Sequence, residues 1–334
     1  MDWSKGYSAR YYISVLDKAT MRDVDRIELI GGTIKRSLTD IRESADVDCR
    51  NYNNKSEQYI RIWLDTKQEG SSSHIPLFTG LATSPRNNYS GRRKQNNVEC
   101  YSLLKIAKDV MLPRGWYAPT EANGGKLVKQ LLSIIGVPIY ISDNAPNLSQ
   151  AIIAEQSENH LSMADKIVTA MNWRLRLDGY GSIFVEPISR DPKVMFDAND
   201  MDMIESEIDV TYDWYNAPNV LRCTLDDSYA IARDDNPKSV LSTVNRGREV
   251  WYEDNNVILN TNETLAEYAN RMLKEYQKSA TNVSYSRRYY PGIYPGDYIR
   301  INYPAQDVSG IFVISDQNVS LGYNARTSEE VVMV

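Results

Sequence analysis

Residues 260–303 read NTNETLAEYANRMLKEYQKSATNVSYSRRYYPGIYPGDYIRINY. The first part of this stretch places six apolar side chains on one helical face: Leu265, Tyr268, Ala269, Met272, Leu273 and Tyr276. Thr264 and Glu267 have the spacing of a capping box, and lysines near the end suit the negative end of a helix dipole. The stretch therefore predicts an amphipathic helix over about 262–279 that packs on a β-sheet.

Strands are predicted directly after this helix. Residues 282–286 and 298–303 are strand-like, and the loop 290–297 between them contains two Pro-Gly pairs, which are turn signals. A buried strand is predicted at 311–314, ahead of a further run at 319–323. The last third of the chain is thus predicted to be a β domain that carries one helix.

The first third of the chain also alternates with a period of two. Apolar and polar side chains alternate in 11–16, 45–49 and 60–64, which places one set in a core and the other outward. A similar run at 27–29 is expected to break at Gly31-Gly32. Short strands separated by turn-rich stretches predict a sandwich or a small barrel.

The middle of the chain changes to helical periodicity after a Pro- and Gly-containing boundary at 113–119. One helix is predicted from Lys126 to Ile135 with Gly136 as its C-terminal cap, and a second is expected to begin near Ser162 as its N-cap. Asp178-Gly179 lies between two strand-like runs, which is a strong hairpin signal. These patterns predict a small α+β unit.

Composition narrows the classes of function. A net charge of −6 argues against non-specific binding of DNA or anionic membranes as a main activity. No apolar run approaches the length of a membrane span, and the first five residues lack the apolar core of a signal peptide, so synthesis and residence in the cytosol are expected. The cysteines are expected to be reduced, buried thiols: Cys49, Cys100 and Cys223.

The ratio of 23 Tyr to 4 Phe has two interpretations. Tyr suits a surface that is covered in an assembly and wet before it, because its ring is apolar and its hydroxyl polar. AT-rich codon usage also favours Tyr. The ratio is therefore compatible with a multi-subunit protein without requiring one.

No catalytic, cofactor-binding or metal-binding set is predicted. The only histidines, His74 and His160, are expected to be solvated loop residues. Residues 197–202 resemble the start of a calcium loop, but Met201 and Ile208 stand where oxygen ligands belong, so an acidic linker is the better interpretation.

Two glycine pairs and one basic run also have the composition of binding motifs. The glycine pairs Gly31-Gly32 and Gly124-Gly125 lack the spacing of a phosphate-binding loop. The basic run 92–94 on an acidic chain is interpreted as a solvated turn or a docking charge. Residues 233–237 and 245–248 are predicted loops by composition.

The order of these parts resembles the tail-hub (baseplate hub) proteins of bacteriophages and related contractile injection systems. The segments that carry the resemblance are Asn219-Val220 at the start of a strand, Asn245-Arg246-Gly247-Arg248, the helix with Tyr268-Ala269 and Leu273, the turn Gly296-Asp297 after residues 290–295, and the middle unit at 173–181. The N-terminal third fits by its position and strand pattern.

This resemblance implies a mainly β, multi-domain fold in which two small barrels flank a helix-helix-hairpin insert. The corresponding domains are 1–112, 113–192 and 193–334, the last carrying the helix at about 262–279. In the family, a homotrimer forms a pseudo-sixfold ring that continues the tail tube and adapts it to a central spike. Some hubs carry a fused lysozyme or peptidase, and none is expected here after Val334.

Expected partners are therefore further copies of the chain, the tail tube protein, a spike or tip protein, a tape-measure protein and other baseplate proteins. DNA is expected only as passing cargo, in a virion tail assembled in the host cytoplasm. We expect a subunit interface at Tyr285, Arg287, Tyr289, Tyr290 and Tyr294. The alternatives are a glycan-binding distal tail or adhesin component and a β-rich glycoside hydrolase, whose paired carboxylates no sequence spacing can reveal.

Overall fold

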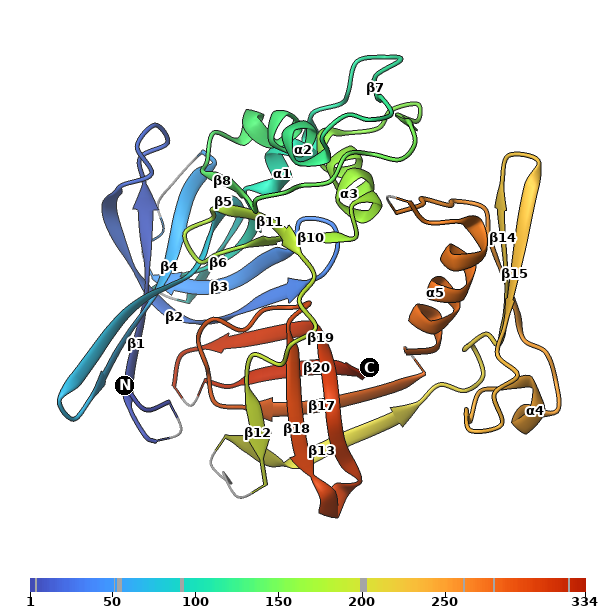
Figure 1. The fold of residues 1–334 in the computed structure, drawn as a ribbon. Helices are drawn as coiled ribbons and strands as arrows, with labels where there is room; N and C mark the ends of the chain where they lie inside the picture. Colours follow the sequence, from blue (N-terminus) through green and yellow to red (C-terminus); the bar gives the residue numbers. More distant parts are fainter. Residues whose placement is uncertain are drawn as a thin grey trace.

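The computed structural model describes residues 1–334 except 4, 51, 53–55, 91–92, 199–202, 261, 279 and 324. The chain is mainly β and divides into several units (Figure 1). No helix in the described ranges has the length and apolarity needed to cross a membrane.

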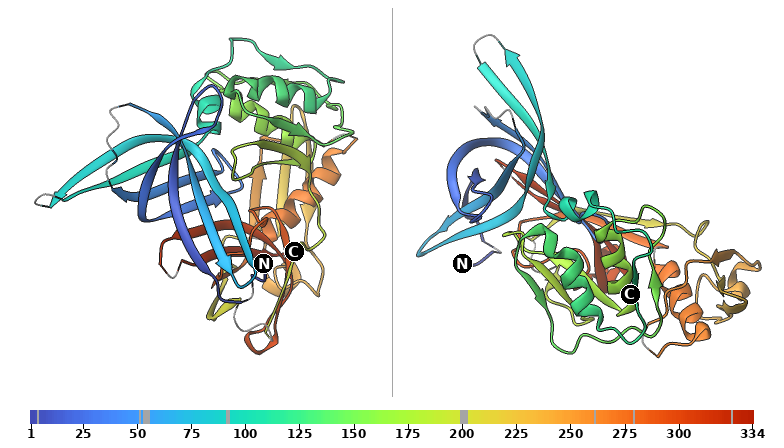
Figure 2. Two further views of the ribbon diagram at one scale, coloured as in Figure 1. Left: turned by 90° about the vertical axis from the view of Figure 1, so that its left-hand side faces the viewer. Right: turned by 90° about the horizontal axis from the view of Figure 1, so that it is seen from above.

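Six antiparallel strands form the N-terminal unit. They are β1 (Ser8–Leu16), β2 (Asp23–Ser37), β3 (Glu43–Arg50), β4 (Gln58–Gln68), β5 (Ser71–Ser90) and β6 (Arg93–Ser102). Because β1 pairs with both β2 and β4, the ring of pairings β1-β4-β5-β6-β3-β2 closes into a barrel. Its core contains Ile34, Val47, Ile62 and Phe78. Figure 2 shows β5 and β6 extending beyond the barrel as a long hairpin.

The expectation that Gly31-Gly32 breaks a strand is wrong. β2 continues through both glycines, with a register shift between Leu29 and Gly31. A Cβ on Gly32 would lie 2.3 Å from the backbone oxygen of Asp46 on β3. The glycine therefore permits a close approach of two strands.

Six further strands make the C-terminal sheet. They are β12 (Met195–Asp197), β13 (Ile204–Tyr212), β17 (Thr281–Arg287), β18 (Tyr298–Tyr303), β19 (Val308–Leu321) and β20 (Thr327–Met333). The separate strands predicted at 311–314 and 319–323 fall on the single strand β19. That strand pairs with β18, with β20 and, through residues 316–321, with β2. One twelve-stranded sheet therefore joins both β units.

The insert contains three helices and two small sheets. Its elements are α1 (Leu104–Asp109), β7 (Tyr117–Ala118), α2 (Gly124–Leu132), η1 (Ser133–Ile135), β8 (Ile139–Ile141), β9 (Ile152–Ile153), α3 (His160–Ala170), β10 (Trp173–Leu177) and β11 (Ile183–Pro187). The hairpin at Asp178-Gly179 and the end at Gly136, with φ 76°, are confirmed. The predicted N-cap Ser162 is wrong: α3 is capped by Asn159, whose side chain accepts from the backbone N–H of Ser162 at 2.8 Å.

Residues 213–280 form a unit between β13 and β17. It consists of β14 (Val220–Leu225), β15 (Ser228–Arg233), α4 (Thr243–Arg246), β16 (Trp251–Asp254) and α5 (Leu265–Lys278). The predicted helix and its capping box are confirmed, because the Thr264 backbone N–H donates to Glu267 at 2.9 Å. However, α5 packs on β14 and β15, with Cys223, Ala269 and Leu273 in a core of their own. The predicted loop at 245–248 includes the end of α4.

Candidate functional site

A chain of buried polar side chains crosses the seam between the two β units. Arg36 on β2 donates to Glu43 on β3 at 2.9 Å and to Gln317 on β19 at 2.7 Å. Gln317 donates to Glu329 on β20 at 2.7 Å, and Arg287 on β17 donates to the same carboxylate at 2.5 and 2.7 Å. All five side chains are buried. The seam is thus held by directional bonds as well as by the β2–β19 pairing.

The buried Glu43 carboxyl group at this seam has a pKa near neutrality. Burial raises the pKa of Glu43 to about 7, against the opposing attraction of Arg36. It lines a cavity of about 260 Å³ together with Arg36, Arg42 and Asp165. A carboxyl group of this kind can serve as a general acid. In this cavity each of the two carboxyl groups has an arginine partner, Arg36 for Glu43 and Arg42 for Asp165.

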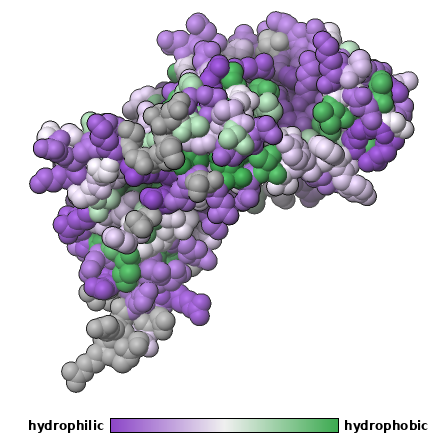
Figure 3. Space-filling model, turned by 90° about the horizontal axis from the view of Figure 1, so that it is seen from below, coloured by the Kyte–Doolittle hydropathy of each residue, from purple (hydrophilic) through white to green (hydrophobic). Residues whose placement is uncertain are grey.

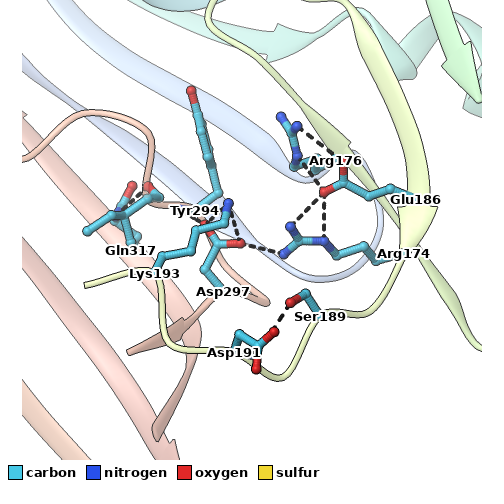
Figure 4. Close-up of polar contacts among 10 residues, drawn as sticks. Arg174, Arg176, Glu186, Ser189, Asp191, Lys193, Tyr294, Asp297 and Gln317 are labelled. Carbon is cyan, nitrogen blue, oxygen red and sulfur yellow. Dashed lines mark hydrogen bonds and ion pairs between the residues drawn. The ribbon is translucent and has the colours of Figure 1, made fainter. Parts of the chain in front are cut away.

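The insert is bound to the C-terminal sheet by a second set of ion pairs (Figure 4). Arg174 on β10 lies 2.6 Å from Asp297 and 2.6 Å from Glu186 on β11, and Lys193 lies 2.9 Å from Asp297. Burial alone would raise the pKa of Glu186, but hydrogen bonds and attraction from Arg176 and Arg174 hold it below the usual value. These contacts connect β10, β11 and the turn before β18.

The insert is also bound to the N-terminal barrel. Arg42 makes a two-pronged contact with Asp165 on α3, at 2.6 and 2.9 Å. The β10–β11 turn lies against β5, where the Thr79 hydroxyl donates to the backbone oxygen of Gly179 at 2.7 Å. A Cβ on Gly179 would lie 1.9 Å from the backbone oxygen of Pro76, so only glycine fits at this contact. The three parts are therefore locked together by polar contacts.

The expectation that both histidines lie in loops is wrong, although the His74 side chain is 53% exposed and thus solvated as expected. His74 lies on β5, stacks on Trp63 with ring centroids 4.0 Å apart, and contacts Asp65 at 2.5 Å. His160 begins α3, and its Nδ1 lies 2.9 Å from the backbone oxygen of Leu131. Both rings lie in regular elements and contact neighbouring groups.

The remaining motifs from the sequence fall in several places. Arg92 and residues 199–202 lie outside the described residues, and so do the side chains of Arg93 and Lys94. Asp197 lies on β12, where its carboxylate accepts from Asn302 at 2.7 Å. Within the described ranges, no group of three His, Cys, Asp or Glu side chains could hold a metal ion. All three cysteines are buried, as predicted.

The five residues expected at a subunit interface lie near the seam. Tyr285, Arg287 and Tyr289 are buried within the chain, and Tyr290 and Tyr294 are half-buried. The Tyr285 hydroxyl donates to Glu329 at 2.7 Å, in the polar chain described above. Most of the surface that this group offers to another molecule therefore belongs to Tyr290 and Tyr294. Their place at an interface stays a prediction.

A polar face extends across both β units on the outside of the long sheet. One row of cross-strand neighbours spans six strands: Tyr101, Ser44, Lys35, Asn318, Ser328 and Ser286. A second row consists of Ser37, Asp316, Glu330, Ser284 and Asp209. The alternate positions of the same strands are buried, including Ile34, Val47, Val283, Val319 and Val331. The period of two thus separates a core from a continuous hydrophilic face.

Carboxylates dominate this face, which we call the acidic face. Eight of them occupy outward positions on β3, β6, β13, β19 and β20: Asp46, Asp48, Glu99, Glu205, Glu207, Asp209, Asp316 and Glu330. Cations on or beside this face include Lys35, Arg50 and Arg326, and Arg326 is paired with Glu205 at 2.6 Å. Sequence reasoning missed this surface. Polar residues at alternate positions are visible in each strand, but their meeting depends on the register between distant strands.

Comparison with known proteins identifies the fold. No sequence family matches the chain, and no curated protein matches it by sequence. The tail protein of Neisseria meningitidis MC58 is similar in structure, with a TM-score of 0.71 and 13% identity, covering 98% of this chain and 97% of that one. The 43 kDa tail protein of prophage MuSo2 from Shewanella oneidensis has a TM-score of 0.70 and 12% identity, covering 98% of each chain.

A type VI secretion component is also similar. The Escherichia coli c3393 protein, which shows structural similarity to T4 bacteriophage tail proteins gp27 and gp5, has a TM-score of 0.52 and 8% identity, covering 92% of this chain and 74% of that one. The chain therefore has the fold of phage tail and baseplate hub proteins, shared with secretion-system components. The predicted resemblance and the mainly β, multi-domain fold are confirmed.

Proposed function

We propose that this chain is a structural hub subunit of a phage tail or a related injection particle, and that it acts by assembly and not by catalysis. Three copies would form a ring that continues the tail tube and joins it to a central spike or tip protein. The fold shared along nearly the whole length with two tail proteins supports this role. The acidic face supports the more specific proposal that the chain forms part of the wall of a DNA channel.

In this proposal the acidic face lines the channel of the ring. DNA carries a dense line of phosphates, so a wall of carboxylates repels it and prevents sticking during passage. Most of the remaining positions carry hydroxyl and amide side chains, with Tyr101, Lys35 and Arg50 among them, and the buried apolar side chains of the same strands point into the core. A surface for tight binding would instead show aromatic and basic side chains.

The dimensions of the sheet agree with a channel. Seven consecutive strands, from β6 to β13, contribute to the face. At a spacing of about 4.8 Å per strand, each copy supplies an arc of about 34 Å, so three copies enclose a ring about 32 Å across. Such a channel admits a DNA duplex. The open edge of β13, beside Tyr212, is where the next copy would continue the wall.

The proposed partners follow from this placement. They are two further copies of the chain, the tail tube protein on one side, a spike or tip protein on the other, and tape-measure and other baseplate proteins. The half-buried Tyr290 and Tyr294 are proposed contact residues. The particle would assemble in the host cytoplasm, with the chain residing in the virion tail or baseplate and DNA as passing cargo.

Electron cryo-microscopy of assembled particles tests the ring. The expected result is a threefold hub in which β13, β17 and β20 face the lumen. A particle in which this face contacts other protein, or a monomer that binds or hydrolyses a glycan, contradicts the proposal. The particle is required for this test because a free hub subunit can remain monomeric until its partner arrives.

Charge reversal tests the acidic face. Particles carrying Glu207→Lys, Asp209→Lys and Glu330→Lys together should assemble but retain DNA when ejection is triggered. The matched control reverses Asp226, Asp227 and Glu253 on the β14–β15–β16 unit, which lies away from the face. Equal DNA retention in both sets would show that the effect comes from net charge and not from a channel wall.

A further inference from the structure

One end of the 213–280 unit presents exposed aromatic and aliphatic side chains beside two arginines. We call this surface the Trp214 patch; its lining residues include Trp214, Tyr215, Val240, Leu241, Arg246 and Arg248. Trp214 is 51% exposed and Tyr215 is 79% exposed. Figure 1 shows α4, which carries part of the patch, at an end of the molecule away from the barrel. In the view from below, most of the surface is hydrophilic and the apolar groups are small and separate (Figure 3).

Hydrogen bonds hold the patch in one shape. The Arg246 guanidinium donates to the backbone oxygens of Ala217 at 2.6 Å and Trp214 at 2.5 Å, which ties α4 to the loop after β13. Fully buried Asn219 donates to the backbone oxygens of Leu241 and Arg248 at 3.1 and 3.0 Å. The aromatic side chains therefore stand on a braced surface, which lowers the entropy lost when a partner binds.

The patch carries positive charge on an acidic chain. Within the described residues, Arg246 donates to backbone carbonyls and no ion pair involves Arg248. Burial and, to a smaller extent, repulsion from the nearby Arg248 lower the pKa of Arg246. Among the nearby carboxylates, Glu249 is paired with Arg233, whereas Asp213 accepts from the neutral amide of Asn216 at 2.9 Å and keeps its charge. A partner that brings a carboxylate would therefore complement Arg248, which is exposed among the lining residues of the patch.

We propose that the Trp214 patch is a docking surface for a segment of another protein that presents a carboxylate beside a large apolar side chain. Trp, Tyr and Arg are the residue types that supply most of the binding energy at protein interfaces. The carboxylate would pair with Arg248, and the apolar side chain would lie between Trp214 and Val240. This inference goes beyond the hub role and does not depend on the ring.

A protein partner is favoured over nucleic acid by the number of available cations. The guanidinium of Arg246 is turned toward backbone carbonyls, which leaves Arg248 as the exposed arginine of the patch. Binding along a phosphate backbone needs several cations, because each cation–phosphate contact contributes a similar part of the binding free energy. The aliphatic lining also suits side chains better than phosphates.

Fluorescence anisotropy with two labelled synthetic peptides tests the proposal. One peptide carries Leu and Trp with Asp and Glu, and the other replaces every Asp and Glu by Lys. The full-length chain should bind the acidic peptide at least about tenfold more tightly than the basic one. Arg248→Glu and Trp214→Ser should each weaken that binding by about tenfold or more.

Two control variants match these changes elsewhere on the surface. Arg222→Glu reverses a half-exposed arginine on β14, and Tyr323→Ser removes a fully exposed aromatic side chain after β19. Neither should change binding of the acidic peptide. Circular dichroism of every variant establishes that it is folded.

Three results would overturn the proposal. The first is no binding of the acidic peptide at about 1 mM. The second is equal binding by Arg248→Glu and the unaltered chain. The third is tighter binding of oligothymidine than of the acidic peptide, lost in Arg248→Glu, which would assign the patch to nucleic acid.

Discussion

Arg287 and Glu329 form an ion pair with both side chains 0% exposed, and their closest nitrogen and oxygen atoms lie 2.5 Å apart. The pair joins β17 to β20 in the middle of the C-terminal sheet. Removing two charges from water is costly, and their attraction offsets that cost only when the remaining hydrogen-bonding positions are filled. Tyr285 and Gln317 fill them on Glu329. The sheet that carries the acidic face thus contains a buried carboxylate in which each oxygen accepts two hydrogen bonds.

Breaking this pair from one side should destabilise the chain strongly. Arg287→Met leaves the Glu329 carboxylate buried without its cation, so the free energy of unfolding should fall by about 3–5 kcal/mol in urea denaturation. Arg50→Met is the matched control, because Arg50 and Glu28 form an exposed pair with 58% and 63% exposure. Its effect should be no more than about 1 kcal/mol. Similar losses in both variants would contradict the internal role of Arg287.

Stability should depend on pH through Glu43. The pKa of Glu43 is raised from 4.5 to about 7 in the folded chain, so the folded state holds this proton more tightly than the unfolded state. Its contribution is greatest below about pH 4.5 and is lost as the pH rises to about 7, by about 3 kcal/mol at most. Glu43→Gln should therefore gain stability relative to the unaltered chain across this range, as measured by urea denaturation at several pH values.

Glu186→Gln is the control with the opposite sign. The pKa of Glu186 is lowered by its arginine partners, so its stabilising contribution is present at neutral pH and is lost as the pH falls. This variant should lose stability relative to the unaltered chain as the pH rises. If the free energy of unfolding changed with pH in the same direction for both variants, the raised pKa of Glu43 would be refuted.

The docking of the insert on the barrel should depend on Gly179. In Gly179→Ala the new Cβ would lie 1.9 Å from the Pro76 backbone oxygen, so the β10–β11 turn must move away from β5. Crowding of this kind costs about 1–3 kcal/mol, and hydrogen exchange at β10 and β11 should accelerate. In Gly6→Ala nothing lies within 4 Å of the new Cβ, and exchange should be unchanged. Unaltered exchange in Gly179→Ala would mean that the turn is not held against β5.

The capping box of α5 should contribute measurably to stability. Thr264→Ala removes the hydroxyl that donates to Glu267 at 2.7 Å and accepts from the Glu267 backbone at 3.3 Å. The expected loss is about 1 kcal/mol by urea denaturation. Thr264→Ser keeps the hydroxyl and should retain most of the stability. If Thr264→Ser and Thr264→Ala lowered the free energy of unfolding equally, the hydroxyl would not be what stabilises the helix.

Elements with signals inside a few neighbouring residues were predictable. Thr264 and Glu267 lie one helical turn apart, and Asp178-Gly179 determines its turn through its own backbone preferences. The end of the predicted helix 126–135 at Gly136 depends in the same way on a left-handed backbone conformation. Such signals need no knowledge of the rest of the chain.

Contacts between distant segments were not predictable. Gly32 resembles a strand breaker until β3 is placed against it, and the face of α5 does not reveal that β14 and β15 receive it. The ion pair between Arg287 and Glu329 inside the chain could not be foreseen either, and the subunit interface expected at Arg287 stays a prediction. The acidic face has the same origin, because it combines residues from strands far apart in sequence.

The sequence by itself determined the secondary structure of the best-marked segments, the mainly β class with an α+β insert, and the resemblance to tail hubs. It did so because helix periods, caps and turn residues act over a few residues. Only the tertiary structure decided that β2 and β19 pair, and with that pairing the seam from Arg36 to Glu329 and the acidic face. The register between two strands that are remote in sequence depends on how both strands pack against the core, so the sequence of either strand alone does not determine that register.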